Sequence, residues 1–576
     1  MRVLRQLVEA LLFERVAMWS SERHPAHGGL DEELSFGVGS SWYCCRGRVG
    51  AFGRVRVVDG SVRKVEQRQA RPVSWQELLE DVPGSPASKA ELAGELENTA
   101  RLCRWNAESL PALRRSRRGL HYDELESLLH EGHPYHPCFK SRTGFSLADH
   151  AAYGPEAGNT FALRWLAVRR SALRQQRPLL DHESFETSAG SRLSDARQQA
   201  RAPIDEFGLL PVHPWQWRKL QGMPALAEGL ARRELIDLEL ELGRYRATQS
   251  LRTLIPVEDH RGDHVKLPLA LRNSSSLRTL QPETVHAAPA VSAWLKGLVQ
   301  GDAFFDEVAG AVVLAEHHSA AYSPLTPETA ALESNLAVIW REPIERHLRA
   351  DEAALPFNAL FALEADGRPF IEPWIERHGL ATWLGRLLRV TLLPLWRLLA
   401  HHGVALEAHA QNLLLLHRDG MPERLALRDF HDSLEYVPSF LAEPESAPDF
   451  TRIDRRFEGA GPGRHYAMSS VLELRDLFID TVMVFNLSEL SWLLEREYGF
   501  RETEFWRLAR GVLGDYRRSR WNDAGRAERI RLGAAFVHTE SLLKARLSAP
   551  TNELLKHVVP SDLHEQVERE IHAGHQ

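Results

Sequence analysis

A strongly polar hexapeptide interrupts the leucine-rich C-terminal half of the chain. It reads EAHAQN, residues 407–412, and it follows the helix-like run TLLPLWRLLAHH, which Gly403 is placed to end. The apolar runs 413–416 and 425–427, separated by the turn residues Asp419-Gly420, fit two strands of a hairpin. A helix, a polar segment and a hairpin in one short stretch favour an α+β fold with a helical majority.

The predicted hairpin brings residues that are distant in the sequence to one rim. With the turn near Gly420, Asn412 faces Asp429, so His409, Gln411 and Asn412 converge with Asp429, and Glu407 lies close by. Such an oxygen-rich group suits magnesium on a nucleotide. The alternative is a polar strand entrance closed by hydrogen bonds, which is reasonable for any single residue. Burying the whole set beside a core is costly without partners, which favours a site.

The length of the chain exceeds what one hydrophobic core supports. At 576 residues we expect about two or three domains. Glycine-punctuated strands and amphipathic runs mark an N-terminal domain at 1–130. Short apolar runs with frequent Pro, Gly and Ser mark a β-rich domain at 131–330, and a mainly helical domain follows at 331–576.

Charge and targeting signals exclude several classes of protein. A formal net charge of -7 argues against a general nucleic-acid binder. Charged residues interrupt the first apolar stretch, MRVLRQLVEALLFERVAMW, so it resembles an amphipathic helix and not a signal peptide. No uninterrupted apolar run reaches the length of a membrane span. We therefore expect a soluble, cytoplasmic protein with no membrane partner.

Cysteines give little chemistry. The four cysteines, Cys44, Cys45, Cys103 and Cys138, form neither a disulfide framework nor a paired CxxC zinc site. The adjacent Cys44 and Cys45 are expected to be structural.

A histidine- and lysine-containing loop is the first candidate binding motif. The segment GHPYHPCFKSRTGFS, residues 132–146, carries a proline after each histidine, which excludes an ordinary helix and leaves a rigid loop. Its side chains His136, Lys140 and Arg142 suit a compound with several carboxylates. An exposed basic loop with no ligand is the alternative.

Two copies of SLRT form the second candidate motif. Ser250–Thr253 and Ser276–Thr279 flank the strand-like KLPLAL, which Lys266 begins. Arg252, Lys266 and Arg278 on adjacent strands would suit a triphosphate, with no Walker sequence and no GxGxxG helix to hold it. Arginines on a solvated strand face are the alternative.

The segment LLPVHPWQWRKL, residues 209–220, favours structure over chemistry. His213 and Gln216 are polar anchors, and packing of Trp215 and Trp217 explains the rest.

In this order, the motifs resemble the aerobactin-synthetase-like IucA/IucC family, the siderophore synthetases that act independently of nonribosomal peptide synthetases. The matching sequences are GHPYHPCFKSRTGFS with YGPE, PVHPWQW, both SLRT copies, and EAHAQN with RD downstream, across about residues 130–435. The N-terminal 130 residues resemble the family much less. The resemblance implies a cupped hand with a helical thumb, β-rich fingers and a helical palm, ATP between fingers and palm, and a homodimer.

The resemblance also implies a reaction. A carboxylate of citrate or a citrate derivative becomes an acyl-adenylate, which an amine, hydroxylamine or alcohol attacks, so that AMP and pyrophosphate are released. The same chemistry on 2-oxoglutarate or a succinyl compound stays an alternative. ATP and Mg²⁺ are the implied cofactors.

The resemblance assigns roles to individual residues. ATP contacts come from Ser250, Arg252, Thr253, Lys266, Arg278, His409 and Gln411. Magnesium is held by Asp429 with Glu407 or Asn412, and the carboxylate substrate by His136, Lys140 and Arg142. Arg278 would neutralise charge in the transition state, and a neutral His136 is the candidate base for the incoming amine.

Three rival functions follow from the same motifs. The family's C-terminal region is likened to ferric-siderophore reductases, but those bind an iron–sulfur cluster through C-terminal cysteines, and the last cysteine here is Cys138. A kinase loop would need an aspartate base, which EAHAQN lacks. A non-catalytic protein that binds a siderophore or iron complex stays open. Products separate them: AMP with pyrophosphate, ADP, or neither.

Overall fold

The N-terminal part joins a buried helix to a small antiparallel sheet. The computed structural model describes residues 2–22, 31–176, 190–274, 276–548 and 555–564. Helix α1 (Arg2–Phe13) is the predicted amphipathic helix, and it packs on strand β4 with Leu7, Val8 and Leu11 fully buried. The sheet follows the predicted glycine-punctuated segment and contains β1 (Met18–Glu22), β2 (Glu32–Val38), β3 (Ser41–Val49), β4 (Val55–Val57), β5 (Arg63–Glu66) and β6 (Gln69–Pro72).

Helices connect this sheet to the middle of the chain. Helix α2 (Trp75–Asp81) precedes α3 (Pro86–Ser109), which begins where the Ser85 side chain accepts from the Ser88 amide. The short helices α4 (Tyr122–Leu128) and α5 (Leu147–Tyr153) flank the predicted rigid loop, which contains no helix and is largely buried.

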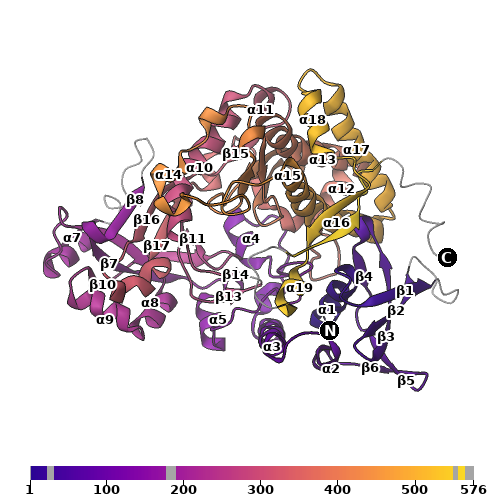
Figure 1. The fold of residues 1–576 in the computed structure, drawn as a ribbon, viewed down its shortest axis with the longest axis horizontal. Coiled ribbons are helices and arrows are strands. Elements are labelled where there is room, and N and C mark those ends of the chain that lie inside the picture. The colour runs from indigo at the N-terminus through magenta and orange to yellow at the C-terminus, as the bar shows by residue number, and fades with distance from the viewer. Residues whose placement is uncertain (1, 23–30, 177–189, 275, 549–554, 565–576) are drawn as a thin grey trace.

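An eight-stranded antiparallel sheet forms the other end of the molecule (Figure 1). Its order is β8-β16-β17-β12-β11-β10-β7-β9, and α8 (Pro214–Gln221) and α9 (Pro224–Ala231) contribute to its core. The strands are β7 (Phe161–Arg169), β8 (Leu173–Gln176), β9 (Phe207–Val212), β10 (Leu235–Ala247), β11 (Thr253–Pro256), β12 (His264–Lys266), β16 (Glu316–Tyr322) and β17 (Ala337–Arg341). His213 caps α8 by accepting from the Trp215 amide, and Trp215 and Trp217 are buried, which confirms the structural interpretation of that segment.

The strand predicted at KLPLAL is wrong. Lys266 ends β12 and does not begin a strand, and residues 267–270 are irregular. Pro268 has no amide hydrogen to contribute to a ladder. The second SLRT copy instead begins in a short hairpin, in which β13 (Arg272–Asn273) pairs with β14 (Ser276–Leu277).

The C-terminal part is helical around a four-stranded sheet. This sheet has the order β15-β21-β20-β18, with β15 at Ala311–Val313, β18 at Ala353–Pro356, β20 at Leu413–Arg418 and β21 at Met421–Leu427. The main helices are α10 (Pro282–Gly301), α13 (Leu380–Arg397), α15 (Val471–Phe478), α16 (Ser488–Tyr498) and α17 (Glu502–Arg518). The continuous helical stretch Val471–Tyr498 is long and apolar enough to cross a membrane, but 89% of its most apolar window is buried, as in a core helix.

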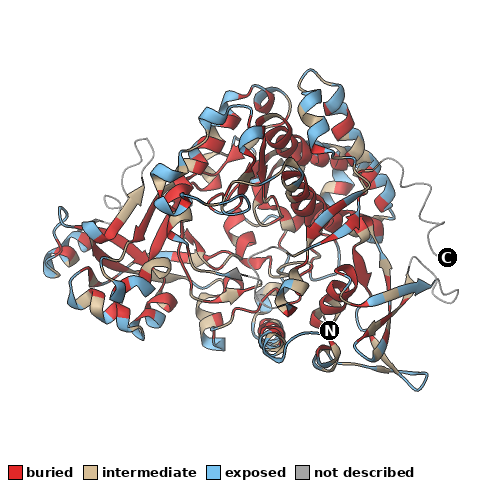
Figure 2. Cartoon of the chain, viewed as in Figure 1, coloured by how far each residue is buried: buried red, intermediate tan, exposed pale blue. Residues whose placement is uncertain are grey.

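The two ends of the chain pack together. The buried Glu14 carboxylate accepts from the Leu543 and Lys544 amides at 2.9 and 2.7 Å, and the Arg54 guanidinium donates to Glu489 at 2.9 Å. One hydrophobic cluster runs from the N-terminal helix through α13 to α17, seen as the buried centre in Figure 2. The predicted α+β class is confirmed, and the domain boundaries at 130 and 330 stay predictions.

Candidate active site

The hairpin after EAHAQN is present. Asp419 and Gly420 both have left-handed backbone angles, with φ of 52° and 83°, as the tight turn between β20 and β21 requires. The turn pairs Arg418 with Met421, and an extra residue at Glu423 then shifts the pairing by one, so that Asn412 is opposite Arg428, one residue short of the predicted Asp429. The Arg428 amide donates to the Asn412 carbonyl at 3.1 Å, which leaves Asp429 just beyond the paired residues.

Asp429 is the centre of a buried charge network. Its Oδ1 accepts from Lys266 Nζ at 2.7 Å and from Arg341 Nη1 at 2.8 Å. Burial alone would raise the pKa of Asp429, but the charges of Lys266, Arg341 and Arg428 lower it well below its usual value. Its φ of 65° is uncommon for a non-glycine residue, and strain of this kind clusters at functional sites.

A second carboxylate fixes the lysine from the other side. Lys266 Nζ lies 3.4 Å from Glu316 Oε1, while Glu316 Oε2 accepts from the Phe430 and His431 amides at 3.1 and 3.0 Å. Glu316 thus ties β16 to the chain that follows Asp429. The lysine is held between two ionised carboxylates in a fixed position.

The two SLRT arginines lie together. Arg252 donates to the Thr279 carbonyl at 2.9 Å, and its Nη2 is 3.9 Å from Asp432. Arg278 donates at 3.3 Å to the Asn273 carbonyl and to Ser274 Oγ. Burial and the nearby Arg252 charge lower the pKa of Arg278 to about 10, although Asp432, Glu407 and Asp429 oppose the shift. The arginines therefore share the electrostatic environment of the acidic rim.

Several buried donors at this site have no protein acceptor. Arg278 Nε, Arg341 Nε and Thr253 Oγ1 are buried without a hydrogen-bond partner among the described residues. Leu251, between Ser250 and Arg252, has a φ of 70°, an outlier for a bulky residue that turns the chain at the first SLRT copy. Unpaired donors beside two like charges are costly unless an anion binds, so this set fits a polyphosphate.

The EAHAQN side chains line the same rim. His409 Nε2 is 3.6 Å from Glu407 Oε1, and Asn412 Nδ2 donates to the Glu407 carbonyl at 2.9 Å. Burial, with Arg278 and Arg428 nearby, lowers the pKa of His409 to about 4, so the ring is neutral at neutral pH. The Gln411 carbonyl accepts from Arg428 Nε at 2.8 Å.

In the first SLRT copy, Ser250 Oγ accepts from the Thr253 amide at 3.2 Å and forms a hydrogen bond of 3.0 Å with the Thr248 hydroxyl.

The oxygen atoms at this rim are of the type that magnesium binds, but the described side chains are not gathered around one point in this structure. Asp429, Asp432 and Glu407 supply carboxylates, and Asn412 an amide oxygen, which is the donor chemistry of a hard cation. Asp432, Arg341 and Glu316 were missed from the sequence. Asp432 had a signal, because it follows Asp429 in RDFHD; Arg341 and Glu316 lie in strands with no motif.

The basic side chains of the loop that was predicted to bind the carboxylate substrate already have partners within the protein. Arg142 donates two bonds of 2.8 Å to Glu156, Lys140 also pairs with Glu156, and Lys140 donates to the His130 carbonyl at 3.0 Å. Glu156, from the YGPE motif, has a fully buried side chain. A substrate carboxylate at Lys140 and Arg142 would have to displace Glu156.

His136 and its neighbour His133 have different surroundings. His136 is 1% exposed, its Nδ1 accepts from the Cys138 amide, and burial with Arg546 nearby lowers its pKa to about 3. Its Nε2 has no hydrogen-bond partner among the described residues. His133 Nδ1 accepts from the Tyr135 and His136 amides at 3.1 and 3.0 Å. Burial, with His136 nearby, lowers the pKa of His133 well below its usual value, so both rings are neutral at neutral pH.

Two family models and several solved structures match this chain. The IucA / IucC family matches residues 121–362, and the ferric iron reductase FhuF-like transporter family matches residues 381–557. That second region contains no cysteine. A solved structure, petrobactin biosynthesis protein AsbB from Bacillus anthracis, superposes with a TM-score of 0.88 at 30% identity, over 98% of this chain and 94% of that one. Aerobactin synthetase IucC from Klebsiella pneumoniae gives 0.81 at 27% identity, over 98% and 97%.

Curated relatives are similar over two thirds or more of the chain. A citryl-spermidine/3,4-dihydroxybenzoyl-citryl-spermidine:spermidine ligase of Bacillus anthracis is 32% identical over 98% of this chain and 93% of its own length. Aerobactin synthase of Escherichia coli is 32% identical over 69% of this chain and 68% of its own length. The chain is an enzyme of the ligase type, and it belongs to the IucA/IucC family of siderophore synthetases.

Proposed function

We propose that this chain is an ATP-dependent, AMP-forming ligase that joins a carboxylate of citrate or a citrate derivative to an amine. The observation that carries the proposal is the meeting of Arg252 and Arg278 with the acidic rim of Asp429, Asp432 and Glu407. The relatives named above, which are ligases and synthases of citrate-derived compounds, support the choice of substrates. A location in the cytoplasm and a homodimer stay predictions.

Charge neutralisation is the chemical task of the arginines. When a substrate carboxylate attacks the α-phosphorus of ATP, an anion approaches a polyanion, and pyrophosphate leaves as its bond to that phosphorus breaks. Arg252 and Arg278, with Lys266 behind them, would offset the developing charge, and Asp429, Asp432, Glu407 and Asn412 would hold the magnesium ion. Bound magnesium would neutralise phosphate charge as a Lewis acid.

Amide formation then needs an amine that has lost a proton. The amine nitrogen attacks the acyl carbon, AMP leaves, and the proton passes to a base. A neutral histidine of the 132–146 loop is our candidate, and His136 stays the proposed base, because its Nε2 is buried without a hydrogen-bond partner among the described residues. We still propose that Lys140 and Arg142 bind the carboxylate substrate, which requires the substrate to displace the Glu156 carboxylate.

A group of carboxylates beside the rim supports a cationic nucleophile. Burial and four neighbouring acids raise the pKa of Glu407 well above its usual value; these are Glu540, Asp432, Glu435 and Asp480. Burial and Glu540 raise the pKa of Glu435 to about 7, although Lys556 opposes this. Mutual repulsion among carboxylates is relieved by a bound polyamine, so we favour an amine with a second positive charge over an alcohol.

The test is pyrophosphate release across a panel of acids and nucleophiles, with the nucleotide product identified. We expect AMP and pyrophosphate with citrate or a citrate monoamide, and faster turnover with spermidine-like diamines than with alcohols of the same length. Turnover only with 2-oxoglutarate or succinyl compounds would replace the acid. ADP would indicate a kinase, and binding of an iron complex without any turnover would indicate a non-catalytic protein.

A further inference from the structure

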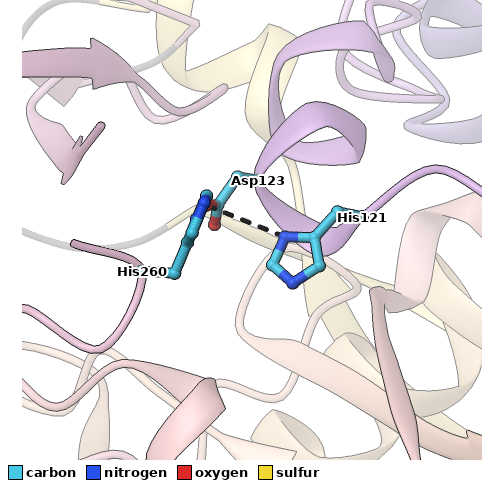
Figure 3. A group of neighbouring side chains, drawn as sticks. All are labelled: His121, Asp123 and His260. Atoms are coloured by element: carbon cyan, nitrogen blue, oxygen red, sulfur yellow. Dashed lines mark hydrogen bonds and ion pairs between the residues drawn. The ribbon is translucent and has the colours of Figure 1, made fainter. Parts of the chain in front are cut away.

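Two histidines and an aspartate meet on the outer side of α4. His121 precedes the helix and Asp123 lies in its first turn, while His260 comes from the loop between β11 and β12 (Figure 3). Asp123 Oδ2 is 2.6 Å from His260 Nδ1 and 3.8 Å from His121 Nδ1. One ligand atom from each of the three side chains lies within 4.8 Å of the others. The rings flank a single carboxylate.

Buried carboxylate oxygens without partners point to a missing cation. Asp123 Oδ1 and both carboxylate oxygens of Glu345 are buried and have no hydrogen-bond partner among the described residues. The side chains of Asp123 and Glu345 are 6% and 9% exposed, and Glu345 Oε1 is 3.9 Å from His121 Nε2. Such orphaned acceptors are costly without a positive partner.

We propose that His121, Asp123 and His260, with Glu345 beside them, bind a divalent transition-metal ion of the zinc class. Two imidazole nitrogens and a carboxylate are donors that suit zinc and its neighbours and not magnesium or calcium. Ligand atoms around tetrahedral zinc are about 3.3 Å apart at bonds near 2.0 Å. The two rings are 48% and 61% exposed, so both are free to adjust to that spacing.

The position of this site gives it a structural consequence. On the inner side of α4, Tyr122 Oη and Glu126 Oε1 each lie 2.6 Å from Arg428 Nη1, directly before Asp429. His260 lies in the loop that joins the strand beginning at Thr253 to the strand ending at Lys266. An ion here would link α4 to that loop and so hold two elements that carry the rim. It would act as a positioning element, outside the reaction itself.

A second cluster of two histidines and an aspartate has a carboxylate that is already paired. Asp302 lies beside His401 and His402, but Arg397 donates to both of its oxygens, at 2.6 and 3.2 Å, and His402 contacts it at 3.0 Å. None of its carboxylate oxygens is without a partner. This cluster is therefore a matched control.

The experiment is a Zn²⁺ titration of the metal-free, full-length protein by calorimetry, with Co²⁺ as a spectroscopic probe, and it needs neither ATP nor substrate. We expect one ion per chain and an increase in Tm on Zn²⁺ binding. His260→Ala and Asp123→Asn should each weaken binding more than about 100-fold, since even outer-shell partners of a metal contribute roughly 10- to 100-fold. The visible ligand-field bands of bound Co²⁺ should change in His121→Ala.

Two controls separate this site from others. His401→Ala should bind Zn²⁺ as the wild type does, and so should Asn412→Ala, which removes a proposed magnesium ligand outside the buried charge network. Absence of stoichiometric binding to the wild type, or equal affinity in well-folded His260→Ala and Asp123→Asn, would overturn the proposal. Because His260 lies in an exposed loop, its variant tests the site even if Asp123→Asn fails to fold. Neither result bears on the ligase reaction.

Discussion

Replacing Arg278 with alanine removes a positive charge from the phosphate side of the proposed site without leaving a buried anion. Its only described hydrogen-bond acceptors are the Asn273 carbonyl and the Ser274 hydroxyl, both at 3.3 Å, and the nearest like charge is Arg252. Loss of two long bonds from the guanidinium to neutral acceptors costs about 1–2 kcal/mol of stability, part of which is offset by relief of the repulsion from Arg252.

The effect on catalysis should be far larger. A fixed donor aimed at developing charge contributes about 2.7–4 kcal/mol, so Arg278→Ala should reduce pyrophosphate release about 100- to 1000-fold. The assay is pyrophosphate release at saturating ATP, with thermal unfolding of the same preparation. Arg244→Ala, an exposed arginine of β10, is the control and should match the wild type. Arg278→Ala turnover within a fewfold of wild type, with an unchanged Tm, would remove Arg278 from the site.

Three further predictions follow from the charge network and the acidic group. Asp429→Ala should abolish pyrophosphate release and also lower the free energy of unfolding by about 3–5 kcal/mol, measured by urea denaturation, because two buried cations lose their shared carboxylate; full stability would contradict the network. Glu156→Gln should cost a similar free energy, while Glu124→Gln, which breaks only the exposed ion pair with Arg115, should cost less than about 1 kcal/mol; equal stabilities would show that Lys140 and Arg142 do not depend on Glu156. The KM for a diamine should rise as the pH falls through about 7, because Glu435 is charged above that pH and neutral below it; the KM for citrate should not follow this step, and Glu435→Gln should remove it.

Local signals in the sequence were sufficient for the elements around the site. The hairpin, its turn at Asp419-Gly420 and the helix ending at Gly403, with a left-handed φ of 83°, depend on short-range chemistry and are present as predicted. The predicted register of the hairpin was wrong by one residue: Asn412 is opposite Arg428, and the extra residue at Glu423 in β21, which helps to set this register, is not encoded in any turn residue. The strand at KLPLAL was wrong because apolar spacing outweighed Pro268 in the prediction.

Long-range partners were beyond the sequence. The basic side chains of the 132–146 loop predicted an open anion-binding site, but the Glu156 carboxylate occupies it. The contact between the YGPE segment and this loop depends on the fold and could not be predicted from the sequence. Arg341 and Glu316 reach the rim from strands of the large sheet without any motif. In contrast, Asp432 could have been predicted from the sequence, because it lies three residues after Asp429 in RDFHD.

The central claim is that a substrate carboxylate attacks the α-phosphorus of ATP at the rim of Asp429 and Arg278. Citrate labelled with oxygen-18 in its carboxylates, incubated with ATP and a diamine, tests it most directly by mass spectrometry of the nucleotide product. An acyl-adenylate requires one labelled oxygen to appear in the phosphate of AMP. Turnover that leaves AMP unlabelled, or that produces labelled inorganic phosphate with ADP, would contradict the account.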